Sequence, residues 1–212
     1  MRTIKNYSGT RELTKEQDDA ITSLLEGNDV APDTLSARDK TTIGFCYHSG
    51  SYLEQDYEKA IYWFKLAAKD NWADAERNLA ICYDKGLGVK RDFDLSTYWY
   101  KRAANHGNAE AMCTIAEMYY EGLGFEQNEQ KAWYWMNKAI DRAFETEDFI
   151  LLSWLGNQYY IGEGMLEKDL SKAVKCFRKA AELDFPLAKK CLSNMIQKGE
   201  IDGTNEEKTI KK

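Results

Sequence analysis

Apolar and small residues recur along the chain in a fixed phase. Five glycines mark that phase, and the gaps between them are 36, 36, 40 and 37 residues: Gly50, Gly86, Gly122, Gly162 and Gly199. Seven positions before each glycine stands an apolar residue, and a small residue follows it directly, as in Leu79 and Ala80. Self-similarity at this period is typical of proteins built from tandem repeats.

Each repeat has the pattern of a helix, a loop and a second helix. After the glycine comes a short polar residue that suits a helix N-cap: Asp56, Asp92, Asn128 and Asp169. The second helix then follows, with small and aromatic residues on one face. A second glycine, such as Gly88, supplies positive φ in the loop. The first repeat has Tyr52 at that position, which predicts a different or strained turn.

The full pattern resembles the Sel-one-like repeat (SLR), a relative of the tetratricopeptide repeat. Its best copy contains Leu79, Ala80, Tyr83, Gly86, Gly88, Asp92, Trp99, Tyr100, Ala103, Ala104 and Gly107. The resemblance implies an all-α chain, a right-handed α/α superhelical solenoid of about four and a half repeats. The boundaries that we assign to the repeats are 37–72, 73–108, 109–148 and 149–185, with a half repeat at 186–200.

Two segments flank the repeats. Residues 1–36 are expected to form an N-terminal capping helix and a linker, because Thr14 and Gln17 have the spacing of a capping box. Residues 201–212 are charged and aperiodic, which predicts a flexible tail. Inside the third repeat, four extra residues lie around 144–148, and Ala143 replaces the closing glycine. We expect this insertion to lengthen a loop.

The composition of the chain argues against several classes of function. The formal net charge is −6, which argues against nucleic acid as a partner. No stretch approaches the roughly 20 apolar residues of a membrane span, and the polar start of the chain has no signal-peptide core. The five cysteines form no CxxC pair, which favours reduced, packed thiols and a cytoplasmic location.

The candidate chemical motifs all have simpler explanations. Gly86-Leu87-Gly88 looks like the start of a dinucleotide-binding loop, but it follows a helix and recurs at 122–124, so a turn explains it. His48 and His106 have no carboxylate at ligand spacing and fit surface positions near helix ends. We therefore predict no enzyme activity, no catalytic residue, no metal site and no small-molecule cofactor.

The first helix of each repeat, helix A, is expected to line a concave groove, by analogy with tetratricopeptide folds. The binding residues predicted there are Arg38, Arg77, Asn78, Glu117, Trp154, Asn157 and Lys190. Thr41 and Thr42 fall on the same predicted face. Trp154 is notable because its counterparts in other repeats are not aromatic, and aromatic and arginine residues are frequent binding hot spots.

These features predict an adaptor or scaffold that binds a protein or peptide in the groove, and the net charge of −6 makes a basic partner one candidate. Two alternatives are open at this point: an inhibitor or immunity protein that neutralises a cognate toxin or enzyme, and an unrecognised hydrolase. The convex face and the segment 143–148 also stay open as binding surfaces.

Overall fold

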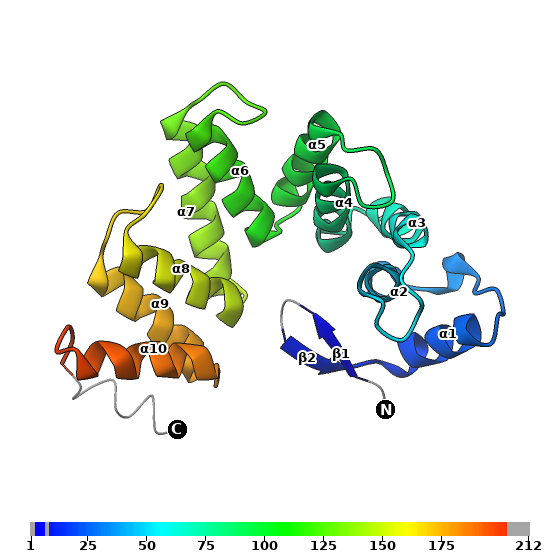
Figure 1. Cartoon of the computed structure of the whole chain (residues 1–212), viewed down its shortest axis with the longest axis horizontal. Coiled ribbons are helices and arrows are strands. Elements are labelled where there is room, and N and C mark those ends of the chain that lie inside the picture. The colour runs from blue at the N-terminus through cyan, green and yellow to red at the C-terminus, as the bar shows by residue number, and fades with distance from the viewer. Residues whose placement is uncertain (1–2, 7–8, 203–212) are drawn as a thin grey trace. The chain divides into compact units, whose positions relative to one another are not determined.

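The computed structural model describes residues 3–6 and 9–202, with side chains from Glu12 onward, and divides the chain into two compact units, 1–132 and 133–212. Its helices are α1 (Lys15–Leu25), α2 (Ala37–Ser49), α3 (Tyr57–Ala68), α4 (Ala73–Lys85), α5 (Phe93–Asn105), α6 (Ala109–Glu121), α7 (Glu129–Glu145), α8 (Phe149–Ile161), α9 (Leu170–Glu182) and α10 (Pro186–Gln197). A short 3-10 helix spans Pro32–Thr34. Figure 1 shows these helices as antiparallel neighbours within each unit.

The even-numbered helices from α2 to α10 are the A helices, and the odd-numbered helices from α3 to α9 are the B helices. The prediction of an all-α tandem-repeat architecture is confirmed for the described repeat region. Asp56, Asp92 and Asp169 each accept a hydrogen bond from a backbone N–H three residues later, as expected for N-caps. The A helices α2, α4, α6 and α8 each end at a glycine in the left-handed region, as Gly86 does with φ 69°.

The insertion in the third repeat is helical, so the expectation of a longer loop was wrong. Helix α7 has 17 residues, whereas α5 and α9 have 13 each. Four residues add about one helical turn, so the added segment keeps nearly the same helix face inward. Ala143 is fully buried within α7. The left-handed residue that closes this repeat is Glu147, with φ 53°.

The N-terminal segment contains an element that the sequence analysis did not anticipate. Strands β1 (Thr3–Asn6) and β2 (Gly9–Glu12) pair antiparallel, with Thr3 opposite Glu12. Helix α1 follows and begins with the capping box of Thr14 and Gln17. The Gln17 side-chain amide also donates a hydrogen bond of 2.8 Å to Asp39, which ties α1 to α2. Of the predicted tail, residues 203–212 lie outside the described part of the chain.

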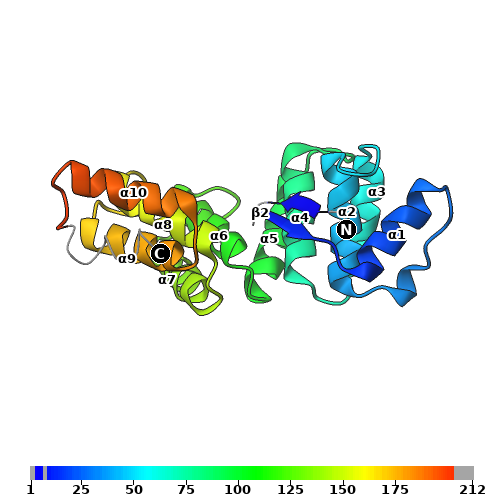
Figure 2. The ribbon, with the colours of Figure 1, turned by 90° about the horizontal axis from the view of Figure 1, so that it is seen from below.

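Small residues on the A helices let each one approach its own B helix. A Cβ on Gly44 of α2 would lie 2.7 Å from the ring of Phe64 on α3, and one on Gly156 of α8 would lie 2.9 Å from Phe177 on α9. Both phenylalanines are fully buried or nearly so. Figures 1 and 2 show α8, α9 and α10 packed side by side in the second unit. The repeated small position therefore sets the close packing inside each repeat.

In the second repeat the second loop glycine, Gly88, is required by the preceding repeat. A Cβ on Gly88 would lie 2.6 Å from the Cβ of Tyr57, at the start of α3, so a side chain has no room. Tyr52 occupies the corresponding position in the first repeat with φ 72°, in the left-handed region that disfavours bulky residues. No B helix precedes this first loop. Tyr52 therefore has the backbone strain that the sequence predicted, but it does not face a B-helix residue as Gly88 faces Tyr57.

Candidate functional site

The seven predicted groove residues all lie on A helices, and they divide between the two units. Arg38 is exposed on α2, Arg77 and Asn78 are half-buried on α4, and Glu117 is exposed on α6; these four belong to the first unit. In the second unit, Trp154 is half-buried and Asn157 exposed on α8, and Lys190 is exposed on α10.

Arg77 connects neighbouring A helices. Its Nη2 lies 2.5 Å from the Oε2 of Glu110 on α6, and the Arg77 side chain is only 18% exposed. Tyr100 of α5 lies close to this pair, and burial raises the pKa of its hydroxyl to about 12. The guanidinium that the sequence analysis assigned to ligand binding is therefore already held by a carboxylate of the same unit.

Helix α6 presents an acidic surface. It carries Glu110, Glu117 and Glu121 and contains no Lys or Arg. Water reaches the Glu117 side chain, yet the surrounding protein removes part of its solvation and raises the pKa of this carboxyl; the charge of Glu121 raises it further. Neither Glu117 nor Glu121 forms an ion pair among the described residues.

Thr41 and Thr42 do not belong to an open face, which corrects their placement from the sequence. They are 9% and 3% exposed. Their hydroxyls donate to backbone carbonyls one turn earlier, those of Ala37 and Arg38. Helix α1 packs against α2, so part of the α2 surface is covered.

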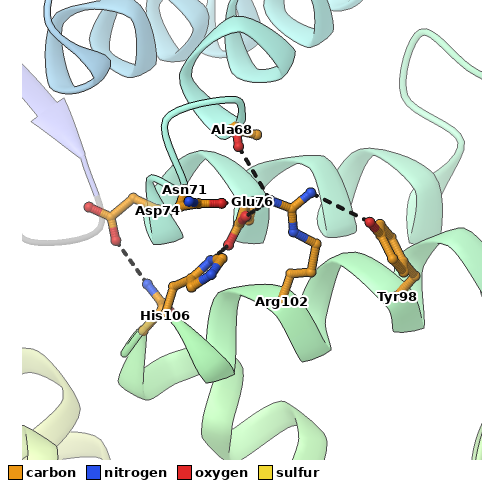
Figure 3. Close-up of polar contacts among 8 residues, drawn as sticks. Ala68, Asn71, Asp74, Glu76, Tyr98, Arg102 and His106 are labelled. Atoms are coloured by element: carbon orange, nitrogen blue, oxygen red, sulfur yellow. Dashed lines mark hydrogen bonds and ion pairs between the residues drawn. The ribbon is translucent and has the colours of Figure 1, made fainter.

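The most strongly polar cluster in the first unit was missed by the sequence analysis. Figure 3 shows Glu76 of α4 between Arg102 of α5 and His106, the residue that caps the end of α5. The Glu76 side chain is fully buried; its Oε1 lies 2.8 Å from Arg102 Nη2, and its Oε2 lies 2.7 Å from His106 Nδ1. The Arg102 contact is an ion pair without an aligned hydrogen bond to Oε1. Two partners thus hold one buried carboxylate.

Arg102 also reaches the preceding repeat. It donates to Asn71 Oδ1 at 3.0 Å and to the carbonyl of Ala68 at 3.4 Å, and its guanidinium lies 5.0 Å from the centre of the Trp99 ring. Figure 3 shows Arg102 beside Ala68 and Asn71 at the junction of α3, α4 and α5. The cluster therefore links consecutive repeats and has the character of a structural connection.

Only a weak signal in the sequence indicated this cluster. Glu76 is 26 and 30 residues from its two partners, so local spacing does not reveal them. Met112 and Leu152 occupy the position of Glu76 in the next two repeats and are buried. A carboxylate where the following two repeats have apolar residues was the available clue, although Lys40 and Lys189 at the same position of the first repeat and the half repeat show that it also accepts charge.

The second unit has an A helix without charge. Helix α8 contains no Asp, Glu, Lys or Arg, and its residues away from the core include Ile150, Trp154, Asn157 and Ile161. Ile161 is 44% exposed. Trp154 was predicted from its position in the repeat, but the lack of charge along the whole helix was not, although the sequence of 149–161 shows it.

Helices α8 and α10 are joined at both ends. The rings of Phe149 and Phe185 lie 5.1 Å apart at the helix starts. At the other end, Tyr160 donates to Glu200 at 3.1 Å and accepts from Lys198 at 2.9 Å. Figure 2 shows α8 and α10 within the same group of packed helices in the second unit. Residues in the middle of α8 and α10 therefore share one face.

The histidines and thiols show no assembled reactive centre. His48 is half-buried between Phe45 and Tyr57, and burial lowers its pKa, with a smaller effect from Lys85. Burial raises the pKa of Cys82 to about 12. Within the described residues no group of three or more potential ligands is placed to hold a metal ion. No helix in that part of the chain has both the length and the apolar character needed to cross a membrane.

The Sel1 repeat model matches four consecutive segments of the chain, 43–72, 73–108, 109–144 and 152–185. These segments cover more than half of its length. The chain belongs to the Sel1 repeat family. Repeats of this family generally mediate protein–protein interactions, and the family is typically a non-catalytic scaffold. The sequence-based assignment to Sel-one-like repeats is confirmed.

Two solved structures are similar to the chain. A protective antigen of uropathogenic Escherichia coli with an SLR fold is 25% identical, with a TM-score of 0.55, and the match covers 82% of this chain and 36% of that one. A Sel1 repeat protein from Oxalobacter formigenes is 23% identical, with a TM-score of 0.66, and the match covers 92% of this chain and 82% of that one. The chain thus spans about a third of the E. coli antigen. No curated protein matches it.

Proposed function

We propose that this Sel1 repeat chain is an adaptor or scaffold that binds a basic protein or peptide segment through its A-helix faces and catalyses no reaction. The observation that carries the proposal is the acidic surface of α6, where Glu117 and Glu121 have no cationic partner among the described residues. Arg77 already holds Glu110, so two carboxylates of the helix are open to a ligand.

The raised pKa of Glu117 supports a cationic ligand. Partial desolvation and the neighbouring Glu121 both disfavour the charge of Glu117 in the free protein. An arriving Lys or Arg side chain would relieve that repulsion and stabilise both carboxylates. An acidic chain of net charge −6 would also accelerate the approach of a basic partner at low salt. A basic toxin or enzyme that is inhibited by the chain would be one such partner.

Capture of partners from native lysate tests the proposal. Three baits are compared: the wild type, Glu117→Gln with Glu121→Gln, and Glu54→Gln with Glu126→Gln, which removes the same charge from exposed loop positions. We expect basic partners to bind the wild type and the loop variant and to be lost from the α6 variant. Their binding should also weaken as salt rises. Equal capture by all three baits would contradict the proposal.

A further inference from the structure

We propose that the second unit carries a separate site for an extended peptide segment with apolar side chains next to a carboxylate. The site, here called the α8–α10 face, consists of Ile150, Trp154, Asn157 and Ile161 of α8 and Leu187, Lys190 and Asn194 of α10. The inference rests on the proposed function in its general form, binding of protein through A helices, but it names a different face and a ligand of opposite charge.

The apolar side chains of this face are not needed for packing. Ile161 is 44% exposed and Leu187 is 55% exposed. In the first unit the positions equivalent to Ile161 hold Lys85 and Glu121, and those equivalent to Ile150 and Leu187 hold Asp74 and Glu110. The repeat therefore folds with charged residues at these positions. Exposed apolar residues gathered on one face mark interaction sites.

The face is long enough for a short extended segment. Ile150 and Ile161 are eleven residues apart on α8, a distance of about 16 Å along the helix. An extended chain advances about 3.3 Å per residue, so about five residues fit beside α8. The contacts at both ends of α8 and α10 keep the two helices adjacent over this length.

Two amides lie between the apolar ends. Asn157 and Asn194 are both exposed, and each stands five positions before the glycine that follows its A helix, Gly162 or Gly199. A primary amide both donates and accepts hydrogen bonds, so it can pair with the N–H and C=O groups of an extended backbone. These side chains suit a segment whose backbone is not already bonded within a helix.

The charge of the face favours an acidic ligand. Neither α8 nor α10 contains Asp or Glu. Lys189 is bound to Asp184 at 2.6 Å, but the neighbouring Lys190 is exposed and forms no ion pair in the described part of the chain. A ligand carboxylate can pair with Lys190, whereas a basic segment would meet only repulsion there. The charge of this face is therefore opposite in sign to that of the α6 surface.

Selection from a phage-displayed library of random nine-residue peptides tests the inference. The full chain is selected in parallel with two variants, Ile161→Asp with Leu187→Asp and, as a matched control, Leu25→Asp with Leu123→Asp, which places the same two charges at exposed apolar residues of the first unit. Peptides enriched on the wild type and the control, but not on the α8–α10 variant, should combine aliphatic or aromatic residues with Asp or Glu. Their synthetic forms should bind the α8–α10 variant at least tenfold more weakly.

Charge reversal sharpens the test. Lys190→Glu should shift the enriched peptides from acidic to basic while their apolar residues persist. Circular dichroism and thermal unfolding of each variant separate lost binding from lost folding. If the two Asp substitutions lower the helix content, the comparison is made with Trp154→Ala and Lys190→Glu instead. The inference is overturned when no peptide separates the wild type from the α8–α10 variant, or when the separating peptides are basic or polar.

Two further readouts separate the competing explanations. Sedimentation that shows a wild-type dimer and a monomeric α8–α10 variant would assign the face to a second copy of the chain and overturn the peptide site. The Glu117→Gln, Glu121→Gln variant is carried through the same selection. Peptides that fail to bind only this variant are assigned to α6. The α8–α10 inference can therefore fail while the proposed function stands, and the proposed function can fail while the α8–α10 inference stands.

Discussion

The two units fill the same positions of one repeat with opposite chemistry. Arg77 and Glu110 form an ion pair between successive A helices of the first unit, whereas Ser153 and Leu187 occupy the equivalent positions in the second. The position of the buried Glu76 is held by Leu152. A single backbone plan accepts both solutions, so the charge or apolarity of an A-helix face is not dictated by the fold. These faces are therefore the places to look for function.

The largest predicted difference concerns two cations at one repeat position. Arg102→Ala should lower the free energy of unfolding by roughly 3–5 kcal/mol, because it removes the guanidinium cation that lies beside the buried carboxylate of Glu76. Lys179 is the equivalent residue of the second unit and pairs with the exposed Glu147, so Lys179→Ala should change stability little. Urea unfolding of both variants measures the contrast.

A double substitution controls for the loss of the Arg102 side chain itself. Glu76→Leu places the residue found at the equivalent Leu152, and combined with Arg102→Met it should recover most of the stability lost in Arg102→Ala. Equal instability of the single and double variants would show that the lost packing of the arginine, and not the buried carboxylate left without its guanidinium, is the cause.

The loop glycines should show a smaller contrast. Gly88→Ala places a Cβ 2.6 Å from Tyr57 and adds strain at φ 68°, so we expect a loss of roughly 2–3 kcal/mol. Gly164 has a similar φ of 74°, but an added Cβ would meet no atom within 4 Å, so Gly164→Ala should cost about 1 kcal/mol. Thermal unfolding compares the two variants directly. Equal losses would mean that backbone strain, not the neighbouring repeat, sets the requirement.

Thiol reactivity should differ between the units without any change in stability. Burial raises the pKa of Cys82 to about 12, and this thiol is fully buried in the first unit. Cys191 of α10 is half-buried, and burial raises its pKa as well. Iodoacetamide at pH 8 should therefore modify Cys191 at least ten times faster than Cys82, because the thiolate must be both present and accessible. Peptide mass spectrometry locates the label, and faster labelling of Cys82 would contradict the packed core.

The smallest expected effect is a dependence of stability on pH between 7 and 5, which we place in the first unit because both histidines precede residue 133. Burial lowers the pKa of His48 below its ordinary value of 6.5, so the unfolded chain takes up this proton first. Protonation therefore favours unfolding, and this part of the stability is present above pH 6.5 and lost as the pH falls below it. His48→Gln should flatten the decline between pH 7 and 5. An unchanged slope would place His48 in a solvated setting.

The sequence predicted those features that depend on neighbouring residues along the chain. Asp92 caps α5 because a short carboxylate lies three residues before an unbonded N–H, and Gly86 ends α4 because only glycine adopts positive φ without penalty. The insertion near Ala143 was misjudged for a related reason. Four residues are as suitable for one more helical turn as for a loop, and local pattern does not separate these outcomes.

What the sequence determined by itself is the repeat: its period, its helices, its caps and its turns, because each follows from contacts within a few residues or from a position repeated in every copy. Only the tertiary structure decided which A-helix residues are open. Arg77 and Glu117 look alike as polar groove positions in the sequence, but one is held by Glu110 and the other is not. Glu76 meets Arg102 and His106 only after α4 and α5 have packed. Pairing and burial depend on neighbours about 30 residues away, and such neighbours leave no local pattern in the chain.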